Sequence, residues 1–230
     1  MEKIAILTIS TGKYIKLFEN LKNSVFEKFL PNHEKTIFLF TDCKYESTNN
    51  IRVNTITHLP WPLNTLLRFN YFNSIIDELK NYDIIYYVDS DIMVNDVVDN
   101  EVIPINNEII AAKHYWYEEQ LGTYETTNKN STSYVESSDL MVGHYCQACF
   151  FGAKTCDFIK MNSTLHNNII EDLKNNTIAI WHDESHFNKY LLNTPCTRLH
   201  TGYTHPSIYD IKDNKNPVKL LHKNAKICGV

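Results

Sequence analysis

At 230 residues the chain is long enough to bury the core of one sizeable α/β domain. Its 43% hydrophobic and 21% charged residues are an ordinary globular balance, which argues against intrinsic disorder. The net charge of -5 offers no basic face, so a nucleic-acid partner is not expected. No stretch reaches the length of a transmembrane segment or of a signal-peptide core. We therefore expect a cytoplasmic protein, at most peripheral to the inner membrane face.

The first part of the chain alternates strand and helix patterns. Apolar runs predict strands at 3–9, 36–40, 51–56 and 84–88. Apolar residues at helical spacing predict helices at 14–29 and 66–79, the second with Asn64 as its cap. Thr11, Gly12 and Lys13 form a sharp turn after the first strand, as at the start of a nucleotide-binding half. This alternation predicts an α/β fold with a mostly parallel sheet.

Two aspartates, Asp89 and Asp91, follow the strand at 84–88. A buried parallel strand delivers its C-terminal end to a ligand crevice. Carboxylates one residue apart at that end can share a hard divalent cation, and the cation can hold the phosphates of a nucleotide. Taken alone the motif is weak, because two solvated aspartates that close a strand have the same pattern.

After Asp91 the pattern is less regular. It predicts strands at 109–112 and 149–152 and helices at 158–173 and 181–192, the last capped by Asp183 or Ser185. The stretch 118–138 is rich in Thr, Ser and Asn and is typical of a long functional loop. The end of the chain, from 221 on, is polar and basic and predicts a flexible tail. No interdomain linker is evident, so we expect one domain over 1–230.

Four blocks of the chain resemble glycosyltransferase family six, which includes the ABO blood-group transferases. In family order they are Thr11-Gly12-Lys13-Tyr14, Val88-Asp89-Ser90-Asp91, Tyr145-Cys146-Gln147-Ala148-Cys149-Phe150-Phe151-Gly152 and Trp181-His182-Asp183-Glu184-Ser185-His186-Phe187-Asn188-Lys189-Tyr190. The resemblance implies the Rossmann-like GT-A glycosyltransferase fold, with a nucleotide-binding half at 1–91 and a half for donor sugar and acceptor at 92–230. It also implies a retaining transfer of galactose or N-acetylgalactosamine from a UDP-sugar to a galactoside, in an α1,3 linkage.

The resemblance further implies how the UDP-sugar is bound. Ile9, Thr11 and Tyr14 match positions that hold uracil and ribose, and Arg68 matches an arginine beside the diphosphate. The aspartate pair matches the family's manganese motif, with Asp91 as the direct ligand and Asp89 bridging metal and nucleotide; Mg²⁺ is the alternative ion. The other positions that the resemblance assigns to the donor are Ser90, Ala148, Cys149, Asp183 and Lys223.

Glu184 matches the family's catalytic glutamate. A carboxylate there can attack the anomeric carbon, or it can stabilise an oxocarbenium-like ion while the acceptor attacks from the leaving-group face. The sequence leaves both mechanisms open. An isolated acid at a helix N-terminus more often serves the helix dipole, but the matched block favours catalysis here.

The segment Gln147-Ala148-Cys149 falls where family members choose their donor sugar. Glycine at the last of these positions leaves room for an acetamido group, and alanine there goes with galactose. Because Cys149 is bulkier than either, we expect UDP-galactose as the donor.

The acceptor positions depart from the family pattern. His114 and Tyr117 stand in a segment that faces the acceptor in the family, but the surrounding residues differ. Trp181 offers an apolar face for stacking, and His182 offers a hydrogen-bonding partner. We expect an oligosaccharide or glycolipid acceptor with a terminal galactose, used in the synthesis of a surface polysaccharide or lipopolysaccharide. No oligomeric state follows from the sequence.

Three alternative functions remain to be weighed. Another retaining GT-A enzyme, an α1,4-galactosyltransferase or a glucosyltransferase, would share the metal motif but not the linkage. A phosphatase with an aspartate nucleophile would carry its motif after the first strand, and Asp89 lies too late for that. A glycan-binding relative without turnover is disfavoured, because Asp89, Asp91 and Glu184 are all intact.

Overall fold

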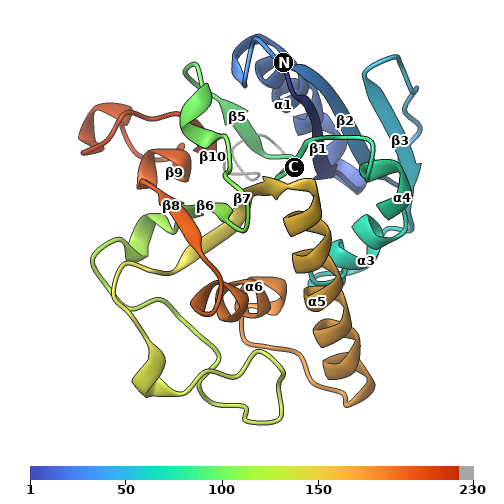
Figure 1. Cartoon of the computed structure of the whole chain (residues 1–230). Helices are drawn as coiled ribbons and strands as arrows, with labels where there is room; N and C mark the ends of the chain where they lie inside the picture. The colour runs from blue at the N-terminus through green and yellow to red at the C-terminus, as the bar shows by residue number, and fades with distance from the viewer. Residues whose placement is uncertain (223–230) are drawn as a thin grey trace.

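The computed structural model describes residues 1–222, and Figure 1 shows how their helices and strands are arranged. The helices are α1 (Ile15–Lys28), α2 (Leu63–Leu66), α3 (Arg68–Asn73), α4 (Ile76–Leu79), α5 (Thr155–Lys174) and α6 (His182–Leu192). The strands are β1 (Lys3–Ile9), β2 (Glu34–Thr41), β3 (Ile51–Thr55), β4 (Ile84–Val88), β5 (Ile92–Val94), β6 (Ile109–Lys113), β7 (Cys146–Lys154), β8 (Cys196–Leu199), β9 (His205–Pro206) and β10 (Leu220–His222). None of the helices formed by residues 1–222 combines the length and the apolar composition that a bilayer crossing requires.

Seven strands form the main sheet, in the order β3-β2-β1-β4-β7-β6-β8. The pairs within β3-β2-β1-β4 are parallel, and so is the pair of β6 with β8. Strand β7 runs antiparallel to both of its neighbours. The prediction of a mostly parallel α/β sheet is therefore confirmed. Because β7 is reversed, its first residues lie beside the residues that follow β4, and the Asp89 N–H bonds to the Cys149 carbonyl at 2.9 Å.

Both faces of the sheet are buried, as the nearly continuous apolar strands predict. In β1, Ile4 and Ile6 pack into a core on one face, and Ala5 and Leu7 pack into a core on the other. Apolar residues of α1 cover the first face, and those of α3, α5 and α6 cover the second (Figure 1). The central strands are thus held on both sides, which makes their C-terminal ends a rigid support for a site.

The single long helix predicted at 66–79 is wrong, because the segment forms the three short helices α2, α3 and α4. The backbone leaves helical geometry at Leu67 (ψ 11°) and at Ile75 (ψ 17°). Apolar residues on both sides of these breaks still face the sheet, which is why their spacing looks continuous in the sequence. Asn64 lies inside α2 and is not its cap; its amide instead bonds to the backbone of Leu59 and to the Thr11 hydroxyl.

A second, three-stranded sheet was not expected from the sequence. Its order is β5-β10-β9, and β10 runs antiparallel to β5, with His222 opposite Ile92. Residues 221 and 222, predicted to begin a flexible tail, are the last two residues of β10. This pairing carries the end of the described chain back to the turn that follows β4.

The long loop predicted at 118–138 is present, and buried polar groups fasten it to the body of the protein. The carboxylate of Glu125 accepts hydrogen bonds from the Thr127 N–H and hydroxyl and from the Asn128 N–H. Its other oxygen accepts one from the Ile180 N–H at 2.9 Å. Because Ile180 immediately precedes Trp181, this carboxylate ties the loop to the turn that begins α6.

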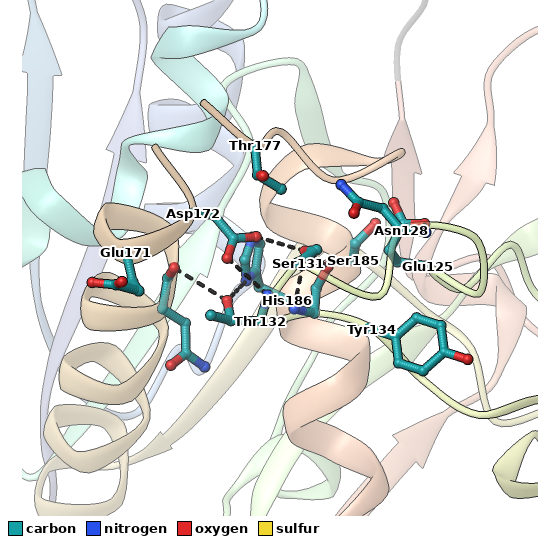
Figure 2. A network of polar contacts seen from close by, with 12 residues as sticks. Glu125, Asn128, Ser131, Thr132, Tyr134, Glu171, Asp172, Thr177, Ser185 and His186 are labelled. Atoms are coloured by element: carbon teal, nitrogen blue, oxygen red, sulfur yellow. Dashed lines mark hydrogen bonds and ion pairs between the residues drawn. The ribbon is translucent and has the colours of Figure 1, made fainter. Parts of the chain in front are cut away.

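A second set of contacts joins the same loop to α5 and α6 (Figure 2). The Asp172 carboxylate accepts hydrogen bonds from the Ser131 hydroxyl at 2.5 Å and from the Thr132 N–H at 2.7 Å. Its Oδ2 atom also lies 3.6 Å from Nε2 of His186, which stands on α6. Burial lowers the pKa of His186 to about 4, so this histidine is neutral near pH 7. Asp172 therefore holds the loop against α5 and also contacts α6 through His186.

We expect Glu125→Gln to lower the free energy of unfolding by about 1–3 kcal/mol, because an amide cannot accept all of the hydrogen bonds that the carboxylate accepts. Urea unfolding followed by circular dichroism measures this. The matched control is Glu136→Gln in the same loop, whose exposed side chain bonds to the Tyr134 hydroxyl. The control should change stability by no more than about 0.5 kcal/mol. Equal effects of the two substitutions would show that Glu125 does not fasten the loop.

Candidate functional site

Two adjoining cavities open where β1 and β4 end and β7 begins. The larger, of about 370 Å³, is lined by Ile9, Thr11, Tyr14, His58, Leu59, Trp61, Asn64, Thr65, Arg68, Tyr87, Asp89, Ser90 and Asp91. The smaller, of about 200 Å³, is lined by Trp61, Thr65, Arg68, Asp89, Gln147, Ala148, Cys149, Trp181, His182, Asp183 and Glu184. Four side chains, those of Trp61, Thr65, Arg68 and Asp89, belong to both, so the cavities form one continuous cleft.

The structure brings the expected donor residues together. Every expected donor residue within residues 1–222 lines one cavity or both, although these residues come from β1 and the turn after it, α3, the turn after β4, β7 and α6. Lys223 lies outside the described residues. The described residues of the widely separated blocks therefore line one cleft.

Asp89 and Asp91 flank Ser90 in the turn after β4. The Tyr87 hydroxyl donates a hydrogen bond to Oδ1 of Asp89. Burial raises the pKa of Asp89, while the Arg68 guanidinium, 3.9 Å from the same oxygen, opposes that shift. A partly buried carboxylate whose pKa is raised is stabilised in its charged form by any further positive charge placed beside it.

His222 adds a nitrogen to this acidic turn. One ligand atom from each of Asp89, Asp91 and His222 lies within 4.8 Å of the others, and Nε2 of His222 is 3.2 Å from Oδ2 of Asp91. Burial lowers the pKa of His222, but the carboxylates of Asp91, Asp89 and Glu184, with Asp91 the largest contributor, together raise it to about 8. Two carboxylate oxygens and an imidazole nitrogen are a donor set that suits a divalent transition metal such as Mn²⁺.

Arg68 occupies the boundary between the two cavities. Its side chain is buried; Nε lies 2.9 Å from the Asp183 carboxylate, and Nη1 donates to the Ala148 carbonyl at 2.5 Å. The guanidinium also lies over the Tyr87 ring, 4.4 Å from its centroid. Burial raises the pKa of Asp183 to about 7, and the positive charge of Arg68 opposes that shift. Arg68 is therefore a fixed cation, held by partners on several elements.

Glu184 projects from the first turn of α6 into the smaller cavity. Its Oε2 atom accepts a hydrogen bond from the Ala148 N–H at 2.9 Å, and burial raises its pKa to about 7. The turn before it is tight, because His182 adopts φ +51° and the Glu184 N–H bonds to the Trp181 carbonyl. A carboxyl group so placed is fixed in direction and gains or loses its proton near neutral pH, which makes it suited to chemistry on a substrate.

The expected acceptor residues divide into two groups. Trp181 is 46% exposed at the rim of the smaller cavity, and the His182 ring meets the Trp61 ring edge to face at 4.7 Å. His114 and Tyr117 line neither cavity. Their rings pack on each other and on the buried Tyr145, whose neighbour is Cys146 at the start of β7. Direct contact of these two residues with an acceptor is therefore not indicated.

Sequence reasoning missed several residues of the cleft. Tyr87 directly precedes the matched block that begins at Val88, so its position could have been proposed from the sequence. His222 gave no such signal, because it is brought to Asp91 only by the pairing of β10 with β5. Gln147 was noted only for its place in the donor-choice segment, and its bond to the His222 ring was not foreseen.

Comparison with known proteins agrees with this geometry. Residues 2–214 match the model for glycosyltransferase family 6. The chain is 32% identical to the O-antigen biosynthesis glycosyltransferase WbnI of Escherichia coli, with 92% of each chain covered. It is 23% identical to histo-blood group ABO system transferases 1 and 2 of Rattus norvegicus, where the alignments cover 85% of this chain but only 58% and 61% of those longer proteins.

The family match runs from residue 2 to residue 214, and the mixed sheet flanked by helices has the arrangement that the GT-A fold requires. Such a match over nearly the whole chain cannot be due to one shared motif. We conclude that this chain belongs to glycosyltransferase family 6 and is a glycosyltransferase.

Proposed function

We propose that this glycosyltransferase moves galactose from UDP-galactose to a terminal galactose of an oligosaccharide or glycolipid, with retention and in an α1,3 linkage. The observation that carries the proposal is the meeting of two cavities at Arg68 and Asp89, one of which reaches Asp91 and the other Glu184. A family relative is named for O-antigen biosynthesis, which supports a surface polysaccharide as the class of product.

In this proposal the donor spans the whole cleft. UDP occupies the larger cavity, with its nucleoside toward Ile9, Thr11 and Tyr14. Asp89 and Asp91 hold Mn²⁺, with Mg²⁺ as the alternative ion. When bound, the cation acts as a Lewis acid that neutralises charge on the departing diphosphate.

Arg68 gives the leaving group a second positive charge. A guanidinium does not lose its proton in proteins, so the charge is present whatever the pH of the reaction. Its direction is set in advance by the Asp183 carboxylate and the Ala148 carbonyl. A charged group that is already in place when the sugar–phosphate bond breaks lowers the activation barrier more than one that must first move into position. Asp183, held in turn by Arg68, binds the donor sugar in the smaller cavity.

Glu184 is the proposed catalytic residue. Ionised, it either attacks the anomeric carbon or stabilises the cationic sugar while the acceptor approaches; both routes retain the anomeric configuration. The Ala148 N–H orients its carboxylate. Trp181 and His182, at the rim of the same cavity, are the proposed acceptor contacts, through stacking and a hydrogen bond.

We expect Asp91→Asn to weaken binding of UDP-galactose in the presence of Mn²⁺ by about tenfold or more, because the loss of a ligand charge loosens the cation and the diphosphate it holds. Calorimetric titration, with Mn²⁺ and then with EDTA, measures the change. Asp77→Asn on α4 is the control, since its exposed carboxylate pairs only with Lys80 among the described residues. Donor binding that EDTA and Asp91→Asn both leave unchanged would contradict the metal-dependent reading.

We expect Glu184→Gln to lower the rate of UDP release from UDP-galactose by about 100-fold or more, with donor binding changed by less than about threefold, because the amide keeps the shape but not the charge. In the unchanged protein kcat/KM should rise as the pH increases through about 7, the pH at which Glu184 loses its proton.

The control for that experiment is Glu171→Gln, an exposed glutamate on α5. It should match the unchanged protein in rate and in pH profile. A Glu184→Gln variant that keeps its rate would remove Glu184 from the reaction.

We expect Cys149→Gly to move the donor preference toward UDP-N-acetylgalactosamine by about tenfold, measured as the ratio of kcat/KM for the two donors. The Cys149 side chain is buried at the wall of the smaller cavity, so removing it opens space for an acetamido group. Cys156→Gly at the exposed start of α5 serves as the control. Preference for UDP-N-acetylgalactosamine in the unchanged protein would overturn the steric argument.

A further inference from the structure

A chain of contacts runs from the wall of the sugar cavity to the acidic turn. Nε2 of Gln147 lies 3.2 Å from Nδ1 of His222, and Nε2 of His222 lies 3.2 Å from Oδ2 of Asp91. Gln147 lines the smaller cavity and Asp91 lines the larger. His222 therefore contacts one lining residue of each cavity through its two ring nitrogens.

We propose that His222 is a third ligand of the cation, that Gln147 sets which ring nitrogen binds it, and that the imidazole makes the site favour Mn²⁺ over Mg²⁺. This inference rests on the proposed metal-dependent function and adds a residue, and a selectivity, to it.

The pairing of strands places His222 beside the acidic turn. In β10 it stands opposite Ile92 of β5, the residue next to Asp91. The strand is also paired with β9 on its other side, so the imidazole is carried by backbone held on both edges. Ligands that share one cation at about 2.1 Å lie within about 4.2 Å of each other, so the observed limit of 4.8 Å needs only a small adjustment of side chains.

The side-chain amide of Gln147 also favours metal binding by His222. Its Oε1 atom is buried and has no hydrogen-bond partner among the described residues. Oxygen and nitrogen of an amide exchange places when the group turns over. Oε1 then accepts a hydrogen bond from a proton on Nδ1 of His222. With the proton on Nδ1, the lone pair of Nε2 is directed at the cation, and any proton that Nε2 carried passes to the solvent.

The chemistry of the third ligand decides the selectivity. Mg²⁺ prefers oxygen ligands and keeps its water, whereas transition metals bind imidazole nitrogen well. A site with two aspartates alone would serve either ion. The nitrogen of His222 gives Mn²⁺ a contact that Mg²⁺ uses poorly. Because the imidazole is neutral, the two carboxylates bring the net charge of the cation and its protein ligands close to zero. The diphosphate of the donor then binds to this neutral group.

A simpler role for His222 predicts the opposite result. If it were only a positive partner for Asp91, it would compete with the cation, and its removal would leave Mn²⁺ binding unchanged or tighter. If it is a ligand, its removal weakens binding. The sign of the change therefore separates the two roles.

The test measures the binding of Mn²⁺ to the whole chain by electron paramagnetic resonance, a readout that does not depend on enzymatic activity. In the unchanged protein, pulsed spectra should show modulation from a ¹⁴N nucleus bound to Mn²⁺. His222→Gln should abolish this signal and raise the Kd for Mn²⁺ by about tenfold or more, with Mg²⁺ affinity changed by less than about threefold. His144→Gln, a histidine that lines neither cavity, is the matched control and should keep both signal and affinity.

Two further variants complete the design. Gln147→Ala should keep the ¹⁴N signal but weaken Mn²⁺ binding by about tenfold, as the loss of a ligand's hydrogen-bond partner does. His222→Asp, which exchanges nitrogen for oxygen, should bind Mn²⁺ without the ¹⁴N signal and raise the affinity for Mg²⁺ relative to Mn²⁺. It tests the idea even if His222→Gln folds poorly.

The outcomes distinguish this inference from the function on which it rests. A ¹⁴N signal that persists in His222→Gln and His222→Asp, or Mn²⁺ binding that is equal or tighter in both, overturns the role of His222 alone. Absence of Mn²⁺ binding to the unchanged protein, with and without UDP, overturns the proposed metal dependence as well.

Discussion

The buried guanidinium of Arg68 is the constraint on which the rest of the site depends. A permanent charge can be taken out of water only where acceptors surround it, because its desolvation is otherwise too costly. Its neighbours are the Asp183 carboxylate, the Ala148 carbonyl and, further away, the Asp89 carboxylate. They come from α6, from β7 and from the turn after β4. One side chain thereby holds three elements in register that are far apart along the chain.

The same arrangement leaves the cleft with more negative than positive charge. The single positive charge of Arg68 faces four carboxyl groups. They belong to Asp89, Asp183 and Glu184, whose pKa values burial raises, and to Asp91, which lies beside His222. Carboxylates in such surroundings favour a divalent cation and disfavour a further anion, unless that cation comes with it. This charge balance gives a physical reason why a transferase with an overall charge of -5 can still receive a nucleotide diphosphate.

The loop at 118–138 contributes to the site from a distance. Its composition is typical of a mobile segment, but Glu125 and Asp172 accept enough hydrogen bonds to hold it against α5 and α6 (Figure 2). The bond from the Ile180 N–H to Glu125 acts on the residue before Trp181. The position of Trp181 and Glu184 thus depends on a loop that touches neither cavity.

The amino-acid sequence by itself determined the class of fold and most of the cleft. Apolar runs at β1, β2, β4 and β6 indicate strands because a strand buried on both faces must be apolar throughout, whereas β3, at the edge of the sheet, is only partly buried. The blocks around Asp89, Cys149 and Glu184 identified the family, which the comparison confirms. The apolar pattern wrongly predicted one helix over α2 to α4, because the apolar spacing continues through two breaks in the helix.

Only the tertiary structure decided which of these residues meet. The reversal of β7 brings Cys149 to Asp89, and the three-residue strand β10 brings His222 to Asp91. A strand of that length has no stability of its own and forms only because β5 and β9 offer it partners. Such pairing depends on contacts between distant parts of the chain, whereas the periodicity that reveals a long buried strand is a property of neighbouring residues. That is why the aspartates could be found in the sequence and their histidine could not.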